Sequence, residues 1–145
     1  MKKYCVLIPF IILLMLICRS AGQDGAPYKI VINPGNPATS MTKEQVSKIF
    51  LKKVSEWPHG KAVSPVDLVE SSPVRQKFSK EIHGKTVASI KAFWQQRIFS
   101  GRDVPPPEKA TDAEVISFVR ENADAVGYVS ATADIGKLKV LQITQ

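Results

Sequence analysis

The segment Ser71-Ser72-Pro73-Val74-Arg75 contains the best candidates for chemistry in the chain. A serine followed by proline is typical of a helix start, with the serine as N-cap and the proline at the first helical position. The first turn of a helix presents unpaired backbone N–H groups and a partial positive charge, which both favour a bound anion. Serine hydroxyls and an arginine guanidinium add further donors for an oxyanion. The segment therefore predicts either an oxyanion site or an ordinary capped helix.

The residues in and around this segment give arguments for both interpretations. Arg75 would stand in the first helical turn, where the helix dipole disfavours a cation, as expected for an arginine retained for function. Glu70 argues the other way, because a carboxylate beside the site would compete with an anion for the same donors. The local sequence alone leaves both interpretations open.

A second candidate segment covers residues 36–40, just before another helix start. Its polar members Asn36, Thr39 and Ser40 would face the same pocket as the first segment, or would form a plain surface turn. Trp57, Trp94 and Phe99 would line a ligand cleft, although large aromatic residues at helical spacing are more often part of a core.

Signatures of catalysis and metal binding are absent from the sequence. It contains no GxxxxGK[ST] phosphate loop, no GxGxxG, no nucleophile elbow and no HExxH. His59 and His83 are expected at a turn and a helix end, and a metal site needs several convergent donors. The scattered serines, histidines and aspartates do not define a catalytic triad. We therefore predict a protein that is not an enzyme and has no metal or cofactor.

The N-terminus has the layout of a secretory signal peptide. A basic start is followed by an apolar run over residues 4–17 and by small residues up to Gly22. The run is shorter than the roughly 20 residues needed to span a bilayer, so we predict cleavage after Gly22, with Ser20 second and an uncleaved anchor as the alternative. Lipidation of Cys18 is disfavoured because the bulky Ile17 precedes it. We expect an exported, periplasmic protein.

Residues 23–145 would form the mature protein, which is long enough for one domain with one core. Cys5 and Cys18 both lie in the predicted signal, so the mature part would contain no disulfide. Its 17 basic and 13 acidic side chains give a net charge of +4. This excess suits a small anionic ligand or an acidic surface, and gives little support to nucleic-acid binding.

The apolar pattern predicts four helices and four strands. Helices are expected after the caps Thr42, Ser72, Thr86 and Thr111, and Thr42/Gln45 and Thr111/Glu114 have capping-box spacing. Strands are expected over residues 28–32, 62–68, 125–129 and 138–143, where Gly127 marks either a close backbone approach or a plain buried strand. This order predicts one α/β domain, a mixed sheet flanked by helices.

Several blocks of the sequence resemble periplasmic phosphate-binding proteins of ABC transporters. They are residues 32–34, 40–46, 49–50, 57, 71–78 and 125–129. Short phosphate-binding-like proteins of about this size also share residues 93–94, 98–101 and 105–106. The resemblance covers nearly all of residues 28–142.

The resemblance implies a type 2 periplasmic-binding-protein fold and a phosphate or similar oxyanion ligand. In that family a Ser-Gly-Thr turn at a helix start holds phosphate, and Ser71-Ser72-Pro73 takes the matching position here. The chain is about half a two-lobed member, so one lobe is expected, with weak binding unless a homodimer or other partner rebuilds the cleft. A membrane permease is the partner that the resemblance implies. The alternative is a ligand-free envelope adaptor or sensor.

Overall fold

A mixed five-stranded sheet forms the centre of the computed structural model, which describes residues 28–145. The predicted signal peptide, residues 1–22, lies outside the described residues. The central strand β1 (Tyr28–Ile32) is antiparallel to both of its neighbours, β6 (Ala125–Ser130) and β7 (Lys139–Thr144). Two short strands extend the sheet in parallel, β2 (Ser40–Thr42) beside β7 and β3 (Ser64–Pro65) beside β6. A separate parallel pair joins β4 (Asp67–Leu68) to β5 (Glu108–Lys109).

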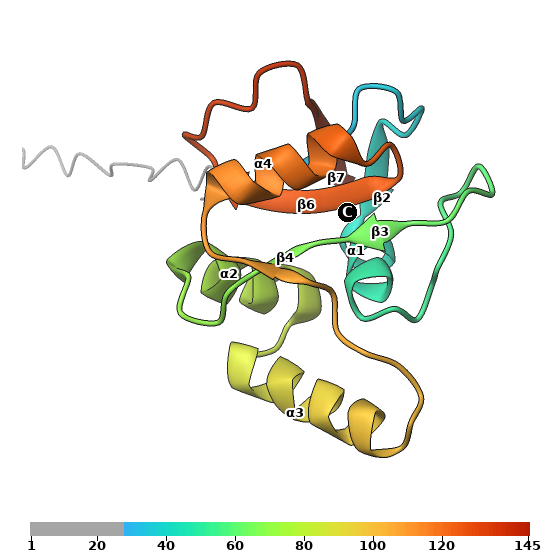
Figure 1. The fold of residues 1–145 in the computed structure, drawn as a ribbon, viewed down its shortest axis with the longest axis vertical. Coiled ribbons are helices and arrows are strands. Elements are labelled where there is room, and N and C mark those ends of the chain that lie inside the picture. Colours follow the sequence, from blue (N-terminus) through green and yellow to red (C-terminus); the bar gives the residue numbers. More distant parts are fainter. Residues whose placement is uncertain (1–27) are drawn as a thin grey trace, which may run out of the picture.

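Helices cover both faces of the sheet (Figure 1). On one face α4 (Asp112–Glu121) packs against β6, where Val115 and Val119 lie over Gly127. The other face is covered by α1 (Lys43–Phe50) and by α2 (Pro73–Phe78), which continues as a π-helical turn, η1 (Ser79–His83). The remaining helix, α3 (Val87–Phe99), contacts η1 and lies away from the sheet. The α/β class with a flanked mixed sheet is confirmed.

Local capping explains where each helix begins. Thr42 and Gln45 form a reciprocal capping box, and so do Thr111 and Glu114, as their spacing predicts. Ser72 caps α2 with Pro73 at the first helical position, and Thr86 caps α3. Gly84 ends η1 with φ 64°, a left-handed conformation that glycine adopts without steric strain.

An aromatic cluster fills the core between the sheet and the α1–α2 layer. The rings of Phe78 and Tyr128 stack with centroids 3.8 Å apart, and Tyr28 meets Phe78 edge-on at 5.4 Å. Phe50 approaches Phe78 at 4.9 Å. All four side chains are buried. Edge-to-face and stacked pairs of this kind add to the stabilisation that their burial provides.

The structure differs from the sequence-based expectation in three places. The extended stretch over residues 62–68 is divided at Val66 into β3 and β4, because the chain leaves β6 there and pairs with β5 instead. The strands β5, of two residues, and β2, of three residues, were not predicted, because strands this short show no alternation of apolar and polar residues. Phe99 is 94% exposed and is therefore not a core residue, unlike the buried Trp57 and Trp94.

Within residues 28–145 the structure contains no helix with the length and apolar character needed to cross a bilayer.

Gly127 marks a close approach between the sheet and α4. A Cβ at this position would lie 2.7 Å from Val115 Cγ1 and 2.8 Å from Val66 Cγ1. We therefore expect Gly127→Ala to lower the free energy of unfolding by about 1–3 kcal/mol, as overpacked cores do. Urea denaturation followed by circular dichroism measures the change. Combining it with Val115→Ala should recover part of the loss, and strictly additive effects would contradict the steric explanation.

Candidate functional site

Ser72 uses its polar atoms to cap α2. Its hydroxyl accepts a hydrogen bond from the Arg75 N–H at 3.3 Å, and its carbonyl accepts one from the Gln76 N–H at 3.1 Å. Its own N–H donates to the Val69 carbonyl at 3.0 Å. Pro73 has no N–H, so the Val74 N–H is the first-turn donor left without a hydrogen bond among residues 28–145.

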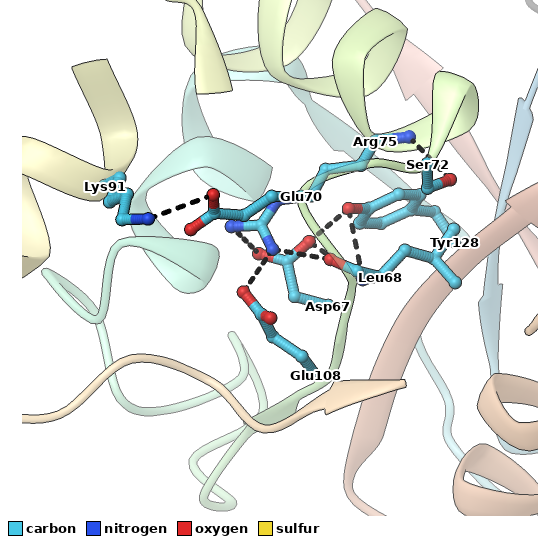
Figure 2. A network of polar contacts seen from close by, with 8 residues as sticks. All are labelled: Asp67, Leu68, Glu70, Ser72, Arg75, Lys91, Glu108 and Tyr128. Atoms are coloured by element: carbon cyan, nitrogen blue, oxygen red, sulfur yellow. Dashed lines mark hydrogen bonds and ion pairs between the residues drawn. The ribbon is translucent and has the colours of Figure 1, made fainter. Parts of the chain in front are cut away.

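Arg75 points away from the helix start into a buried polar network (Figure 2). Its guanidinium donates to the Leu68 carbonyl and to the Glu108 carboxylate, and lies 3.4 Å from Asp67 Oδ2. Arg75 is 5% exposed and Asp67 is 6% exposed. One side chain thus connects α2 to β4 and β5.

Asp67 is held from the other side by two donors. Its Oδ1 accepts hydrogen bonds from the Tyr128 hydroxyl and from the Leu68 N–H, the latter at 3.0 Å. Burial raises the pKa of the Asp67 carboxyl, against the lowering effects of Arg75, Tyr128 and Leu68. Burial and the Asp67 carboxylate together raise the pKa of Tyr128 above its ordinary value, so this hydroxyl keeps its proton and donates.

This network determines what Arg75 can do chemically. Its positive charge already faces two carboxylates, Asp67 and Glu108, within the same cluster. An oxyanion would have to compete with both for the guanidinium, and displacing them would leave a buried carboxylate without a partner. Arg75 therefore holds the Ser71–Ser72 turn, which precedes α2, from its buried side, and it has little positive potential to offer a ligand.

The outer side of the turn remains open. Ser71 is exposed, and Ser72 is partly exposed. Glu70, the residue before them, forms an ion pair with Lys91 of α3 at 3.3 Å. Donors without a hydrogen-bond partner among residues 28–145 here include the Ser71 hydroxyl and the Val74 N–H, and the Glu70 charge is balanced by Lys91.

The second predicted segment has a different environment. Asn36 is 4% exposed, and its Oδ1 accepts from the Ala38 N–H at 2.9 Å. Its carbonyl accepts from Lys139 Nζ at 2.7 Å, while its Nδ2 has no hydrogen-bond partner among the described residues. Thr39 and Ser40 are exposed, and the Thr39 carbonyl accepts from the Gln142 N–H at the edge of the sheet.

The two predicted segments lie at opposite ends of α4. The loop leading to Asn36 is attached to the last turn of α4, where Asn33 Nδ2 donates to the carbonyls of Val119 and Arg120. Arg75 instead contacts Glu108, just before the first turn of that helix. A ten-residue helix is about 15 Å long. The structure thus groups Ser71, Ser72 and Arg75, and places Asn36, Thr39 and Ser40 elsewhere.

Two surface hollows lie near these elements without including the predicted residues. One, of about 520 Å³, is lined by Gln76, Lys80, Gly84, Lys85, Thr86 and Val87. The other, of about 320 Å³, follows α4 and is lined by Lys109, Ala113, Glu114, Ser117, Phe118 and Glu121. Within residues 28–145 no three His, Cys, Asp or Glu side chains gather as a metal site would require.

Sequence reasoning missed Asp67, Glu108 and Tyr128, the partners that decide the role of Arg75. Asp67 did give a local signal, because it is a lone carboxylate in the otherwise apolar run Val66-Asp67-Leu68-Val69. A charged residue in such a run usually needs a buried partner.

Removal of Arg75 is expected to leave Asp67 buried without its counter-charge. Arg75→Met should therefore lower the free energy of unfolding by about 3–5 kcal/mol, the range for half-removed buried ion pairs. Adding Asp67→Asn should restore part of this loss, because the amide Oδ1 still accepts from Tyr128 and Leu68. Urea denaturation of both variants tests this, and a fully stable Arg75→Met protein would contradict the structural role.

His83 gives a pH dependence that can be tested in the same way. Its Nδ1 lies 2.8 Å from Ser47 Oγ, and burial, with Arg75, Lys53 and Lys85 nearby, lowers its pKa to about 4. The unfolded chain would protonate near pH 6.5, so stability is present above that pH and is lost as the pH falls towards 4. We expect a loss of up to about 3 kcal/mol over this window.

Denaturant unfolding between pH 7 and 4 measures this loss. His83→Gln should flatten the curve across that range, and the difference between the two proteins separates the histidine from the carboxylates. Parallel curves for the wild-type protein and the variant would refute the assignment to His83.

Comparisons with known proteins identify the fold. No family model and no curated protein matches the chain. Among solved structures it is similar to a candidate phosphate ABC transporter substrate-binding protein with bound phosphate from Clostridium perfringens (TM-score 0.64, 18% identity, 81% of this chain and 44% of that one). It is also similar to an ABC-type phosphate transport receptor from Vibrio cholerae (TM-score 0.62, 23% identity, 81% of this chain and 46% of that one). A third similar structure is a possible phosphate binding protein from Planctomyces limnophilus (TM-score 0.62, 22% identity, 82% of this chain and 42% of that one).

The chain spans less than half the length of each of these proteins. The fold is that of a type 2 periplasmic-binding-protein lobe, a mixed sheet flanked by helices, as the sequence resemblance implies.

Proposed function

We propose that this protein is an exported, non-enzymatic binding lobe that takes phosphate or a similar oxyanion at the start of α2. The observation that carries the proposal is the turn of exposed Ser71 and partly exposed Ser72, beside which the Val74 N–H has no hydrogen-bond partner among residues 28–145. The likeness to the lobes of phosphate-binding proteins supports it. Residues 23–145 would form the mature domain, after removal of the signal at residues 1–22.

The roles of the individual residues follow from their contacts. The Ser71 hydroxyl and the Val74 N–H would contact the anion directly, and the helix dipole would favour its charge. Ser72 would shape the turn through its cap, and Arg75 would hold the turn against β4 and β5. Asn36, Thr39 and Ser40 lie at the far end of α4, so they would form a separate, secondary contact.

The affinity of this site is expected to be low. One lobe leaves the anion in contact with water on its open side, where electrostatic interactions are weak. We expect a dissociation constant on the order of 0.1–1 mM for the monomer. Delivery to a membrane permease is a further part of the proposal, motivated by the transporter proteins of the same fold.

A second candidate function is an envelope adaptor or sensor that has lost the ligand. The pairing of Arg75 with Asp67 and Glu108 favours it, because the single cation of the turn is already neutralised. In that case the lobe would act through its surface.

Phosphate titration distinguishes the two functions. The full chain is titrated with phosphate, and separately with sulfate, to about 10 mM, roughly ten times the expected constant. NMR amide shifts are the readout. Oxyanion binding should shift the amides of Ser71, Ser72 and Val74 first. Ser71→Ala should weaken binding at least several-fold, since a direct hydrogen bond is lost.

Matched cap variants provide the control. Ser72→Ala and Thr111→Ala each remove one helix N-cap, at the proposed site and on α4. The first should weaken phosphate binding and the second should not. An unchanged spectrum throughout the titration would contradict oxyanion binding and leave the adaptor function.

A further inference from the structure

The helix α3 is the outermost element of the described chain (Figure 1). It is attached along one side only, where Ile90 and Trp94 pack with Leu51 and the half-buried Phe93. Its 13 residues extend for about 20 Å. The opposite side of the helix has no partner among residues 28–145 and faces solvent.

The free side of α3 carries a stripe without charge. Ala88, Ala92, Gln95 and Phe99 follow one another at spacings of four, three and four residues, and all four are exposed. This is the spacing of the a and d positions in a coiled-coil seam. We call these four residues the α3 seam.

The exposed residues of α1 and α4 have a different character, since three of the four on each helix are charged. Outside its buried face, α1 exposes Lys43, Glu44, Gln45 and Lys48, and α4 exposes Ala113, Glu114, Arg120 and Glu121. Charged residues are typical of solvated faces, whereas depletion of charge with an aromatic residue is typical of the core of a protein interface. Phe99, at 94% exposure, is the most exposed large apolar side chain of the described residues.

The seam is complementary to itself. It has a small residue, Ala88, at its N-terminal end and a large one, Phe99, at its C-terminal end. If two copies pack antiparallel about a two-fold axis between Ala92 and Gln95, each Phe99 lies over the Ala88 of the other copy. A parallel pair would instead place Phe99 on Phe99 and leave a gap between the alanines.

The flanking residues fit the same arrangement. Lys91 and Ile98 border the seam on one side, and Ser89 and Gln96 border it on the other. In the antiparallel pair Lys91 lies beside Ile98 of the second copy, and Ser89 lies beside Gln96. No like charges therefore oppose each other across the axis.

From this we propose that the α3 seam docks a second copy of this chain as an antiparallel helix pair. One helix face buries much less than the roughly 800 Å² per partner of a stable interface, so the dimer is weak and depends on concentration. We expect a dissociation constant on the order of 0.1–1 mM. The inference goes beyond the proposed function and does not depend on oxyanion binding.

Sedimentation equilibrium of the full chain, from about 10 µM to about 1 mM, tests the association over the expected range. Phe99→Glu should weaken it at least ten-fold, because two carboxylates would enter the seam. Val54→Glu, at a position 40% exposed and outside α3, is the matched control and should leave it unchanged. A protein that stays monomeric at every concentration would overturn the proposal. A dimer that Phe99→Glu does not weaken would overturn it as well, because such a dimer would be held elsewhere, for example by the apolar run over residues 4–17.

Disulfide trapping tests the antiparallel geometry. In a full chain carrying Cys5→Ser and Cys18→Ser, protein with Ala92→Cys is mixed with protein with Gln95→Cys and oxidised. Disulfides should form mainly between the two different variants. Ala88→Cys alone should form none, because its two copies would be offset by about 16 Å along the pair. Efficient Ala88–Ala88 cross-linking would indicate a parallel pair and overturn the antiparallel assignment.

Discussion

The buried guanidinium of Arg75 holds together the part of the molecule on which the proposed function depends. It contacts the Leu68 carbonyl, Asp67 and Glu108, and so connects a helix to two strands of only two residues each. Such short strands cannot hold their register through their own hydrogen bonds. A charge transferred out of water requires good partners, and here it finds two carboxylates and a carbonyl, of which the buried Asp67 depends most on this side chain. The position of the α2 turn follows from that requirement.

The same interaction explains an apparent defect in the sequence. A cation in the first turn of a helix is unfavourable to the helix dipole, which made Arg75 a candidate ligand residue. The structure supplies a different reason, because the side chain extends to carboxylates that stabilise it more than the dipole opposes it. Asp67 and Glu108 are therefore responsible for a feature that resembled an anion site. Donors for an anion are left on the outer side of the turn, at Ser71 and Val74.

The features that the sequence predicted well are those encoded within a few residues. Both capping boxes join residues three apart, and the buried strands show their apolar pattern directly. The partners of Arg75 are not of this kind, since Glu108 is 33 residues away and belongs to a strand too short to have a period. The position of Asn36 relative to Ser72 depends on how α4 lies across the sheet, which no local pattern encodes. Phe99 stands five residues beyond Trp94, which places it on the side of α3 opposite the core face, so its exposure follows from helical geometry.

One ion pair links the two proposed surfaces directly. Lys91 borders the α3 seam and pairs with Glu70, which precedes the serine turn. Docking of a second copy would remove water from Lys91 and strengthen its hold on Glu70, which in turn would reduce the competition of that carboxylate with a bound anion. Because both side chains are about half exposed, the pair contributes no more than about 1 kcal/mol. The coupling that this ion pair carries between dimer and anion is therefore limited to roughly five-fold in affinity. This lobe would bind its anion and its second copy almost independently, in contrast to a two-lobed protein that closes around its ligand.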